Sequence, residues 1–158
     1  MRYVLLDRIT VLEPPARARG VKCVTLSDDV FADHFPGHPV MPGALTLEAL
    51  AQLGGVLCEA TMRLAINGGR NDLHALLVGV ERAKFRRLVR PGDKLELEAN
   101  AVHVGENGGQ VGGTVHVDGQ LVAEAELTFA FAEVKHPKLI ERRREVLNIW
   151  LHGSSEEP

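Results

Sequence analysis

Cysteine is scarce in this sequence, which contains only Cys23 and Cys58 in 158 residues. Two cysteines cannot form a disulfide framework. We therefore expect the fold to depend on an ordinary hydrophobic core, for which this length is sufficient. Cys58 lies within an apolar stretch, where we interpret its thiol as a small buried side chain.

A strong charge of either sign is also missing. The formal net charge is −3, and charged residues make up 25% of the chain against 45% for hydrophobic ones. Proteins that bind nucleic acids usually contain a strongly basic domain, so we expect no nucleic-acid partner. The composition is typical of one globular domain and not of a disordered chain.

Long apolar runs without charges are absent too. The most hydrophobic stretch, residues 44–65, includes Glu48, Glu59 and Arg63. Charged residues inside a membrane span are costly, and mostly apolar helices also occur in protein cores. We therefore favour a buried helix over a membrane span. The first residues form no apolar segment typical of a signal peptide, and we expect a cytoplasmic protein.

The remaining pattern predicts two strands, one long helix, four more strands and a final helix. Glycine and proline mark the breaks, and apolar residues alternate with polar ones in the later strands. The predicted strands cover 3–12, 20–27, a segment from His74 onward, 94–100, 109–117 and 120–134, and the predicted helices cover 44–65 and 138–151. A helix that is apolar nearly all round must be wrapped by other structure. We expect a curled sheet around it, in an α+β fold.

The loop before the long helix is stiffened by prolines and contains two histidines. Pro36, Pro39 and Pro42 prevent a helix from starting before residue 42. The unperturbed pKa of histidine lies near neutrality, which suits His34 to proton abstraction. His38 either supports such a site or bonds the backbone of the turn. The two histidines are four residues apart, but the proline between them prevents the helical geometry of a paired metal site. We expect no metal and no cofactor.

The start of the long helix adds an acid and a site for negative charge. Glu48 lies in an apolar helix, where burial would favour the protonated form that can donate a proton. Gly43 and Ala44 offer backbone N–H groups at the positive end of the helix dipole, where an oxyanion can be stabilised. A base, an acid and an oxyanion site together suit proton abstraction beside a carbonyl, followed by loss of a hydroxyl.

At this point a family resemblance is visible. The segment His34-Phe-Pro-Gly-His-Pro-Val-Met-Pro-Gly43, followed by Glu48-Ala-Leu-Ala-Gln52, resembles the signature of the β-hydroxyacyl-acyl-carrier-protein dehydratases of fatty-acid synthesis. Residues 3–8 are similar to the opening segment of that family, and residues 83–93 to its second block. The likeness spans about residues 2–132.

The resemblance implies a hotdog fold for residues 1–135, in which an antiparallel sheet wraps one long central helix. It also implies a homodimer whose sheets join edge to edge and whose active sites lie at the interface, or a larger assembly of such dimers. The chain from about residue 135 extends beyond the typical end of the family. Its apolar stripe predicts a C-terminal helical extension at residues 136–152, which could cover a sheet edge, and we expect a disordered tail at residues 153–158.

The resemblance also assigns roles to the candidate residues. His34 would remove the α-proton of a 3-hydroxyacyl thioester, and Glu48 of the partner subunit would assist loss of the β-hydroxyl as water. The N–H group of Gly43, with the helix start behind it, would polarise the thioester carbonyl, while Gln52 orients Glu48 or a water. The product would be a trans-2-enoyl thioester. Asp33 stands where the family usually has glycine, and it could alter the basicity of His34 or narrow the entrance.

A group of basic residues suggests how an acyl carrier protein would dock. Alternation predicts that Arg82, Lys84 and Arg86 share one face of a strand, and Arg87 and Arg90 follow closely. Acyl carrier proteins are acidic, so a basic surface near the entrance would steer them. In the alternative interpretation, carboxylates on the next strand, Glu96 and Glu98, neutralise these cations.

Two further functions stay open on the sequence alone. The hotdog framework serves several thioester reactions, so the fold does not exclude a thioesterase or an enoyl-CoA hydratase. The spacing of His34 and Glu48 favours the dehydratase. A non-catalytic module that binds acyl thioesters is the third possibility, and the presence of both residues argues against it.

Overall fold

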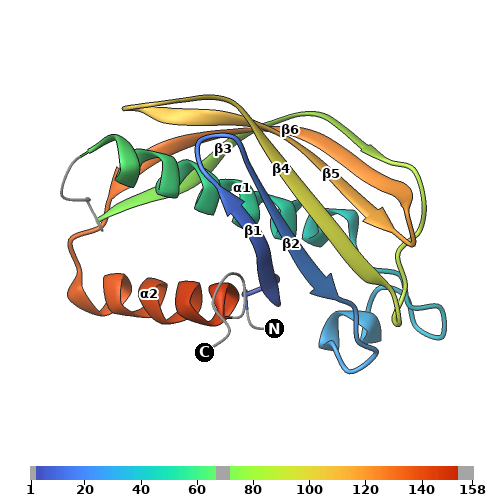
Figure 1. The fold of residues 1–158 in the computed structure, drawn as a ribbon. Coiled ribbons are helices and arrows are strands. Elements are labelled where there is room, and N and C mark those ends of the chain that lie inside the picture. Colours follow the sequence, from blue (N-terminus) through green and yellow to red (C-terminus); the bar gives the residue numbers. More distant parts are fainter. Residues whose placement is uncertain (1–2, 67–71, 153–158) are drawn as a thin grey trace.

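Six antiparallel strands form one sheet that curls over a long helix in the computed structural model, which describes residues 3–66 and 72–152. The strand order is β1-β2-β4-β5-β6-β3, and helix α1 (Gly43–Ala65) lies between this sheet and helix α2 (Pro137–Leu151) (Figure 1). The strands are β1 (Arg8–Glu13), β2 (Arg17–Cys23), β3 (Leu73–Phe85), β4 (Lys94–Gly105), β5 (Gly108–Val117) and β6 (Gln120–Glu133). The expected hotdog arrangement, with an additional C-terminal helix, is confirmed.

Helix α1 forms the centre of the core because most of its faces are apolar. Leu50, Leu53 and Leu57 are completely buried, and burying such a side chain stabilises the fold by about 1.5–3 kcal/mol. The glycines in the middle of the helix allow the sheet to approach closely. A Cβ added at Gly54 would lie 3.2 Å from the ring of Phe129. Glycine at this position therefore allows β6 to pack closely against α1.

The strands after α1 follow the predicted alternation. In β4, Leu95, Leu97 and Ala99 point into the core, while the residues between them are more exposed. The turn between β5 and β6 consists of Asp118 and Gly119, whose φ angles of 49° and 75° are both positive. Such a turn matches the twist of paired strands, so these two residues fix the register of the hairpin.

The first two strands differ from their predicted bounds. The strand predicted at 3–12 begins only at Arg8, because the backbone before it is bound by side chains. The N–H group of Leu5 donates to Oε1 of Gln52 at 3.0 Å, and Nε1–H of Trp150 donates to the carbonyl of Leu6 at 2.7 Å. The strand predicted at 20–27 is β2, which ends at Cys23.

Helix α2 confirms the helix predicted at 138–151 and is joined to the main core. Leu147 and Trp150 are buried in the same hydrophobic cluster as α1 and the sheet. The helix packs beside β1, one of the two edge strands. The predicted division into residues 1–135, 136–152 and 153–158 stays a prediction, and the last of these ranges lies outside the described residues.

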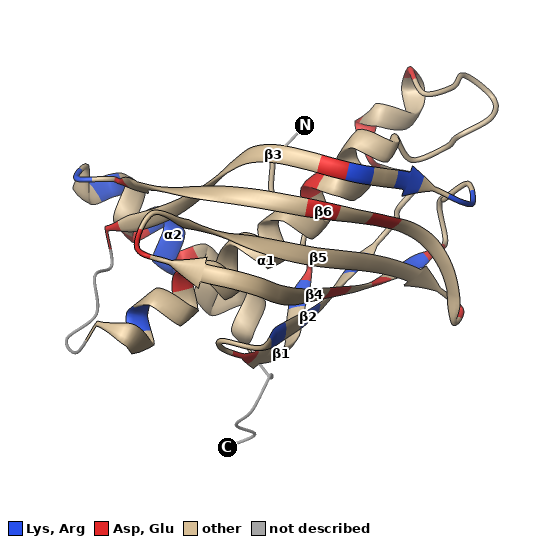
Figure 2. Ribbon diagram, turned by 90° about the horizontal axis from the view of Figure 1, so that it is seen from above, with Lys and Arg blue, Asp and Glu red and all other residues tan. Residues whose placement is uncertain are grey.

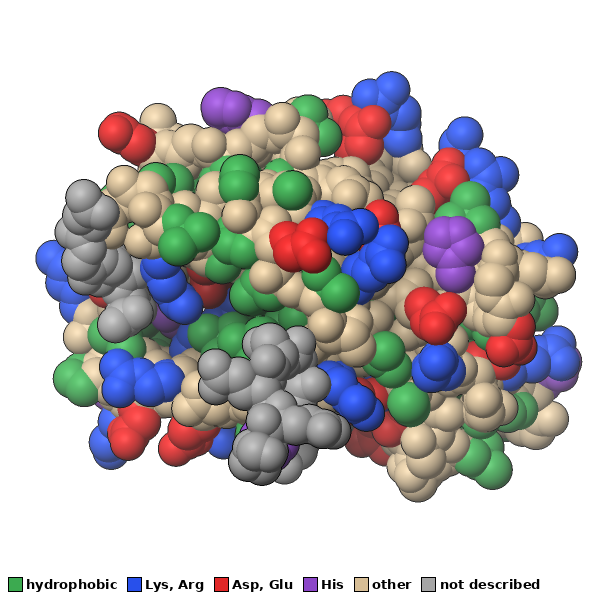
Figure 3. All heavy atoms as spheres, in the orientation of Figure 1, with side chains coloured by type: hydrophobic (Ala, Val, Ile, Leu, Met, Phe, Trp, Pro, Cys, Tyr) green, Lys and Arg blue, Asp and Glu red, His purple; other side chains and the backbone are tan. Residues whose placement is uncertain are grey.

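Charges of both signs are mixed over the face of the molecule shown in Figure 3, where neither sign gathers into one continuous surface. No helix within residues 3–66 or 72–152 has the length and hydropathy needed to span a membrane.

Candidate active site

The loop around His34 is held by hydrogen bonds that also fix the histidine ring. The N–H group of Val40 donates to the carbonyl of His34 at 3.0 Å, and the ring atom Nδ1 lies 2.7 Å from the carbonyl oxygen of Val40. A carbonyl oxygen can only accept, so Nδ1 must carry the proton. In the neutral ring, Nε2 of His34 then has the free lone pair that a general base requires.

His34 shares a cavity with the start of α1. The cavity has a volume of about 400 Å³, and its lining includes His34, Gly43, Ala44, Phe85 and Arg87. A Cβ at Gly43 would lie 2.8 Å from the ring of Phe85. Only glycine fits there without displacing that ring.

The backbone at this helix start offers hydrogen-bond donors to a ligand. The N–H groups of Leu45 and Thr46 both donate to the carbonyl of Pro42, at 3.0 and 3.2 Å. The N–H groups of Gly43 and Ala44 precede them and have no acceptor within the helix. Together with the helix dipole, these two groups can stabilise negative charge beside His34.

His38 and Asp33 lie outside this arrangement. The exposed ring of His38 accepts a weak hydrogen bond at Nε2 from Nη2 of Arg90, at 3.4 Å. Its backbone N–H donates to the carbonyl of Phe35 at 2.8 Å, and its side chain is not part of the His34 cavity. This geometry agrees with a role of His38 in the turn. Asp33 is exposed, and its predicted effect on the site stays a prediction.

Glu48 is held by the side chain one turn further along α1. Nε2 of Gln52 donates to Oε1 of Glu48 at 3.0 Å. The orientation of the Gln52 amide is fixed because its oxygen accepts the N–H group of Leu5. The segment before β1 therefore holds the Gln52 side chain so that its NH₂ group donates to the carboxylate of Glu48.

Tyr3 is a further residue of the Glu48 cavity. The charge of Glu48, burial and a hydrogen bond to Glu48, in decreasing order, raise the pKa of the Tyr3 phenol. Tyr3 therefore lies beside the carboxylate of Glu48, and both residues line the same cavity. The contact joins residues 45 positions apart, and no local pattern indicates it.

Within one chain, His34 and Glu48 line different cavities. Glu48 and Gln52 line a cavity of about 420 Å³ that also includes Gly55 and Glu59. His34 does not contribute to this lining, and Glu48 does not contribute to the cavity of His34. Each chain thus has one cavity with the predicted base and another cavity with the predicted acid, and neither cavity contains both.

The basic residues of β3 pair with the neighbouring strand β6. Arg82 and Arg86 form ion pairs with Glu126 and Glu124, at 2.7 and 2.8 Å, and acidic and basic segments lie next to each other on these strands in Figure 2. The hydrogen bonds from Arg86 lower the pKa of Glu124. A bulge follows Glu81, where the positive φ of Arg82, 51°, interrupts the predicted strict alternation.

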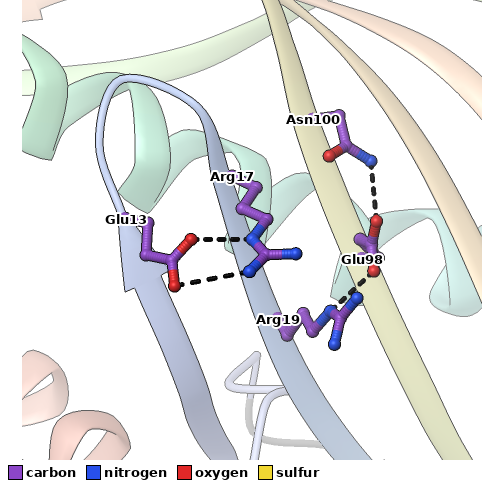
Figure 4. Close-up of polar contacts among 5 residues, drawn as sticks. All are labelled: Glu13, Arg17, Arg19, Glu98 and Asn100. Carbon is purple, nitrogen blue, oxygen red and sulfur yellow. Dashed lines mark hydrogen bonds and ion pairs between the residues drawn. The ribbon is translucent and has the colours of Figure 1, made fainter. Parts of the chain in front are cut away.

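The alternative in which Glu96 and Glu98 neutralise these cations is wrong. Strand β4 pairs with β2 and β5, not with β3. Glu98 instead accepts hydrogen bonds from Asn100 at 3.0 Å and Arg19 at 2.6 Å (Figure 4). These contacts, led by the one from Asn100, lower the pKa of Glu98.

Arg87 and Arg90 lie near the His34 loop, where Arg90 contacts His38. Both are exposed, and Arg87 lines the cavity itself. Lys84 lies opposite Glu124 in the register of β3 and β6. In the described part of the chain, no cluster of three or more His, Cys, Asp or Glu side chains could hold a metal ion.

Comparison with known proteins places the chain in a family. A model of the FabA-like domain matches residues 1–126. The chain is 47% identical over 131 residues to the 3-hydroxyacyl-[acyl-carrier-protein] dehydratase FabZ of Bacillus velezensis (strain DSM 23117 / BGSC 10A6 / LMG 26770 / FZB42), covering 83% of this chain and 89% of that relative.

Solved structures share the fold at much lower identity. The dehydratase heterocomplex ApeI:P from Xenorhabdus doucetiae matches with a TM-score of 0.68 at 18% identity, covering 89% of this chain and 90% of that one. A hot-dog-like protein from Thermanaerovibrio acidaminovorans matches with a TM-score of 0.60 at 19% identity, covering 83% and 90%. On the family model and the sequence identity, this chain belongs to the FabA-like family of 3-hydroxyacyl-acyl-carrier-protein dehydratases.

Proposed function

We propose that the protein removes water from 3-hydroxyacyl thioesters of an acyl carrier protein, in sites that two identical subunits complete together. The observation that carries this proposal is the separation of His34 and Glu48 into different cavities of one chain. A second subunit whose His34 cavity faces the Glu48 cavity of the first would unite base and acid.

The order of events follows from the groups in each half. Nε2 of His34 takes the α-proton of the substrate, and charge develops on the thioester oxygen. The N–H groups of Gly43 and Ala44 stabilise that charge. Glu48 of the partner subunit gives a proton to the β-hydroxyl, which leaves as water while the Cα–Cβ double bond forms. One proton is taken and one is given, so His34 and Glu48 must exchange protons with solvent before the next turnover.

Strand β3 is the edge through which two subunits would join. In the described part of the chain, it pairs with β6 on one side only. Leu76, Val78 and Val80 on this strand are 52%, 62% and 42% exposed. An exposed, apolar edge strand is a template for pairing with another chain, and pairing of two β3 strands gives the two-fold symmetry common in homodimers.

Mass spectrometry of a 3-hydroxyacyl carrier protein incubated with the enzyme tests the reaction. We expect the mass of the carrier-bound product to fall by one water while the thioester remains intact. Release of the free 3-hydroxy acid would instead indicate a thioesterase. Acyl binding without any change in mass would indicate a binding module.

Arg87 and Arg90 give the carrier protein a docking surface. Their charges are exposed beside the His34 cavity, whereas Arg86 is paired with Glu124. We expect the variant Arg87→Glu, Arg90→Glu to lower kcat/KM for carrier-bound substrate by about 10-fold or more, because like charges slow association with an acidic partner. Turnover of a short thioester without a carrier should change much less.

The matched control reverses the charge of a basic residue on α2, in the variant Arg144→Glu. Arg144 is exposed and does not line the His34 cavity, so its variant should keep wild-type rates with both substrates. Equal losses on carrier-bound and carrier-free substrate in the Arg87, Arg90 variant would reject the docking surface.

A further inference from the structure

The Glu48 cavity extends along one side of α1. Glu48, Gln52, Gly55 and Glu59 all line it, and their spacing of three and four residues places them in one row on the helix surface. From Glu48 to Glu59 the row is about 16 Å long at the helical rise. A groove therefore leads away from the predicted acid along the helix.

The walls of this groove are mostly apolar in its middle part. Ala51 and Gly55 of α1 form one side, and Ala75, Leu77 and Phe129 of the sheet contribute to the other. Gly55 leaves the groove open here, because a Cβ at this position would meet only Ala75 and Phe129, at 3.5 and 3.7 Å. An extended hydrocarbon chain suits such a groove better than a polar ligand does.

Helix α2 closes the far end with an ion pair. Nη2 of Arg143 donates to both carboxylate oxygens of Glu59, at 3.1 and 3.2 Å, and Glu59 also accepts the N–H group of Ala75 at 2.9 Å. Glu59 is only 3% exposed. Leu139 and Val146 of α2 complete this end of the lining. The groove thus changes from apolar walls to a buried charged wall.

This end wall lies outside the part of the chain that matches the family model. The match covers residues 1–126, and α2 begins at Pro137. Glu59 belongs to the matched part, but its partner Arg143 does not. The closed end therefore depends on a residue outside the segment that the family model matches.

We infer that the Glu59–Arg143 ion pair sets an upper limit to the acyl-chain length of the substrate, with the acyl chain lying in the groove that runs from Glu48. The inference rests on the proposed dehydration, which places the 3-hydroxyl group at Glu48. A chain whose end stops beside Gly55 contacts mostly apolar walls and does not reach the ion pair. A longer chain pushes its methyl end against the ion pair and excludes water from the two charges without replacing any hydrogen bond, which is unfavourable.

Two variants should move this limit in opposite directions. The double variant Glu59→Gln, Arg143→Met removes both charges of the pair and keeps a side-chain oxygen for the N–H group of Ala75. It leaves the charge of Arg63, which lies 3.9 Å from Glu59 but whose side chain is 33% exposed to solvent. It should raise kcat/KM for acyl chains just beyond the wild-type limit by about 10-fold or more. One methylene group more or less in a hydrophobic pocket usually changes kcat/KM by at least this factor. Gly55→Leu fills the middle of the groove and should lower kcat/KM for the longer accepted chains by a similar factor.

The measurement is kcat/KM over a series of 3-hydroxyacyl carrier proteins that differ by two carbons. Arg144→Met is the matched control, because it makes the same replacement at an exposed position of the same helix. It should leave the length profile unchanged. Thermal melting of each variant identifies any that fail to fold. If the folded double variant retains the wild-type length profile, the ion pair does not set the limit and the inference is wrong. If Gly55→Leu retains it, the acyl chain does not lie in this groove and the inference is wrong as well.

Calorimetric binding of saturated acyl carrier proteins of the same lengths separates this inference from the proposed function. Suppose that the length limit for binding moves in the variants but no substrate loses water. The proposed dehydration would then be rejected, and the role of the ion pair would stand. If dehydration is observed but its length limit stays fixed in the double variant, the role of Glu59 and Arg143 is rejected and the dehydration stands.

Discussion

Replacing His34 with alanine should lower kcat/KM for dehydration by roughly 10²-fold or more, the scale of general acid–base catalysis. Nε2 of His34 is the free imidazole nitrogen in the cavity that contains the N–H groups of Gly43 and Ala44. Alanine removes this base and one hydrogen bond to the carbonyl of Val40. The backbone bonds of the loop, such as Val40 N–H to the His34 carbonyl, remain.

The measurement is the steady-state rate of enoyl thioester formation, with circular dichroism to verify the fold. His38→Ala is the matched control, because it removes the other histidine of the same loop. The ring of His38 lies outside the cavity, so its variant should keep activity within about threefold, which corresponds to less than 1 kcal/mol. A His34 variant at the wild-type rate, or a His38 variant that is equally impaired, would overturn the assignment of the base.

Much of the fold could be predicted because it depends on local patterns. The apolar length of α1, the alternation in β4 and the Asp118–Gly119 turn each specify their own element. The first and last residues of β1 and β2 could not be predicted in the same way. The chain before Arg8 has strand-like composition, but side chains far along the sequence, Gln52 and Trp150, bind its backbone groups. Local propensity contains no information about such partners.

The candidate site likewise contains residues that local sequence groups together and residues that only the tertiary fold brings to the site. His34, Gly43 and Ala44 could be grouped from the sequence because a short, stiff loop leads from one to the others. Tyr3 and Arg143 could not be recognised, because they reach Glu48 and Glu59 only through the tertiary fold.

The partners of the basic residues were uncertain for a topological reason. Consecutive strands are often neighbours in a sheet, which made Glu96 and Glu98 on β4 reasonable partners for the cations of β3. The sheet order instead places β6 beside β3. A pairing of strands that are not consecutive cannot be read from the charges on either strand.

Mixing two inactive variants, His34→Ala and Glu48→Gln, should restore activity. If each active site combines His34 of one subunit with Glu48 of its partner, a mixed dimer contains one site with both substitutions and one site with neither. After random reassortment about half of the dimers are mixed, so we expect about one quarter of wild-type activity. The two variants are unfolded together, refolded, and assayed beside each variant refolded alone.

The control for this experiment combines His34→Ala with Glu48→Gln in one chain. Mixing that double variant with wild type yields dimers in which each site has lost one of its two groups, so activity should fall below the value expected for independent chains. If His34 and Glu48 acted within one chain, mixing the single variants would restore nothing, and wild-type chains would keep their full activity beside the double variant. The two arrangements therefore predict opposite results in both mixtures. The two arrangements also differ in the geometry that they require. A site within one chain would need the separate cavities of His34 and Glu48 to merge, whereas a shared site leaves each cavity as it is.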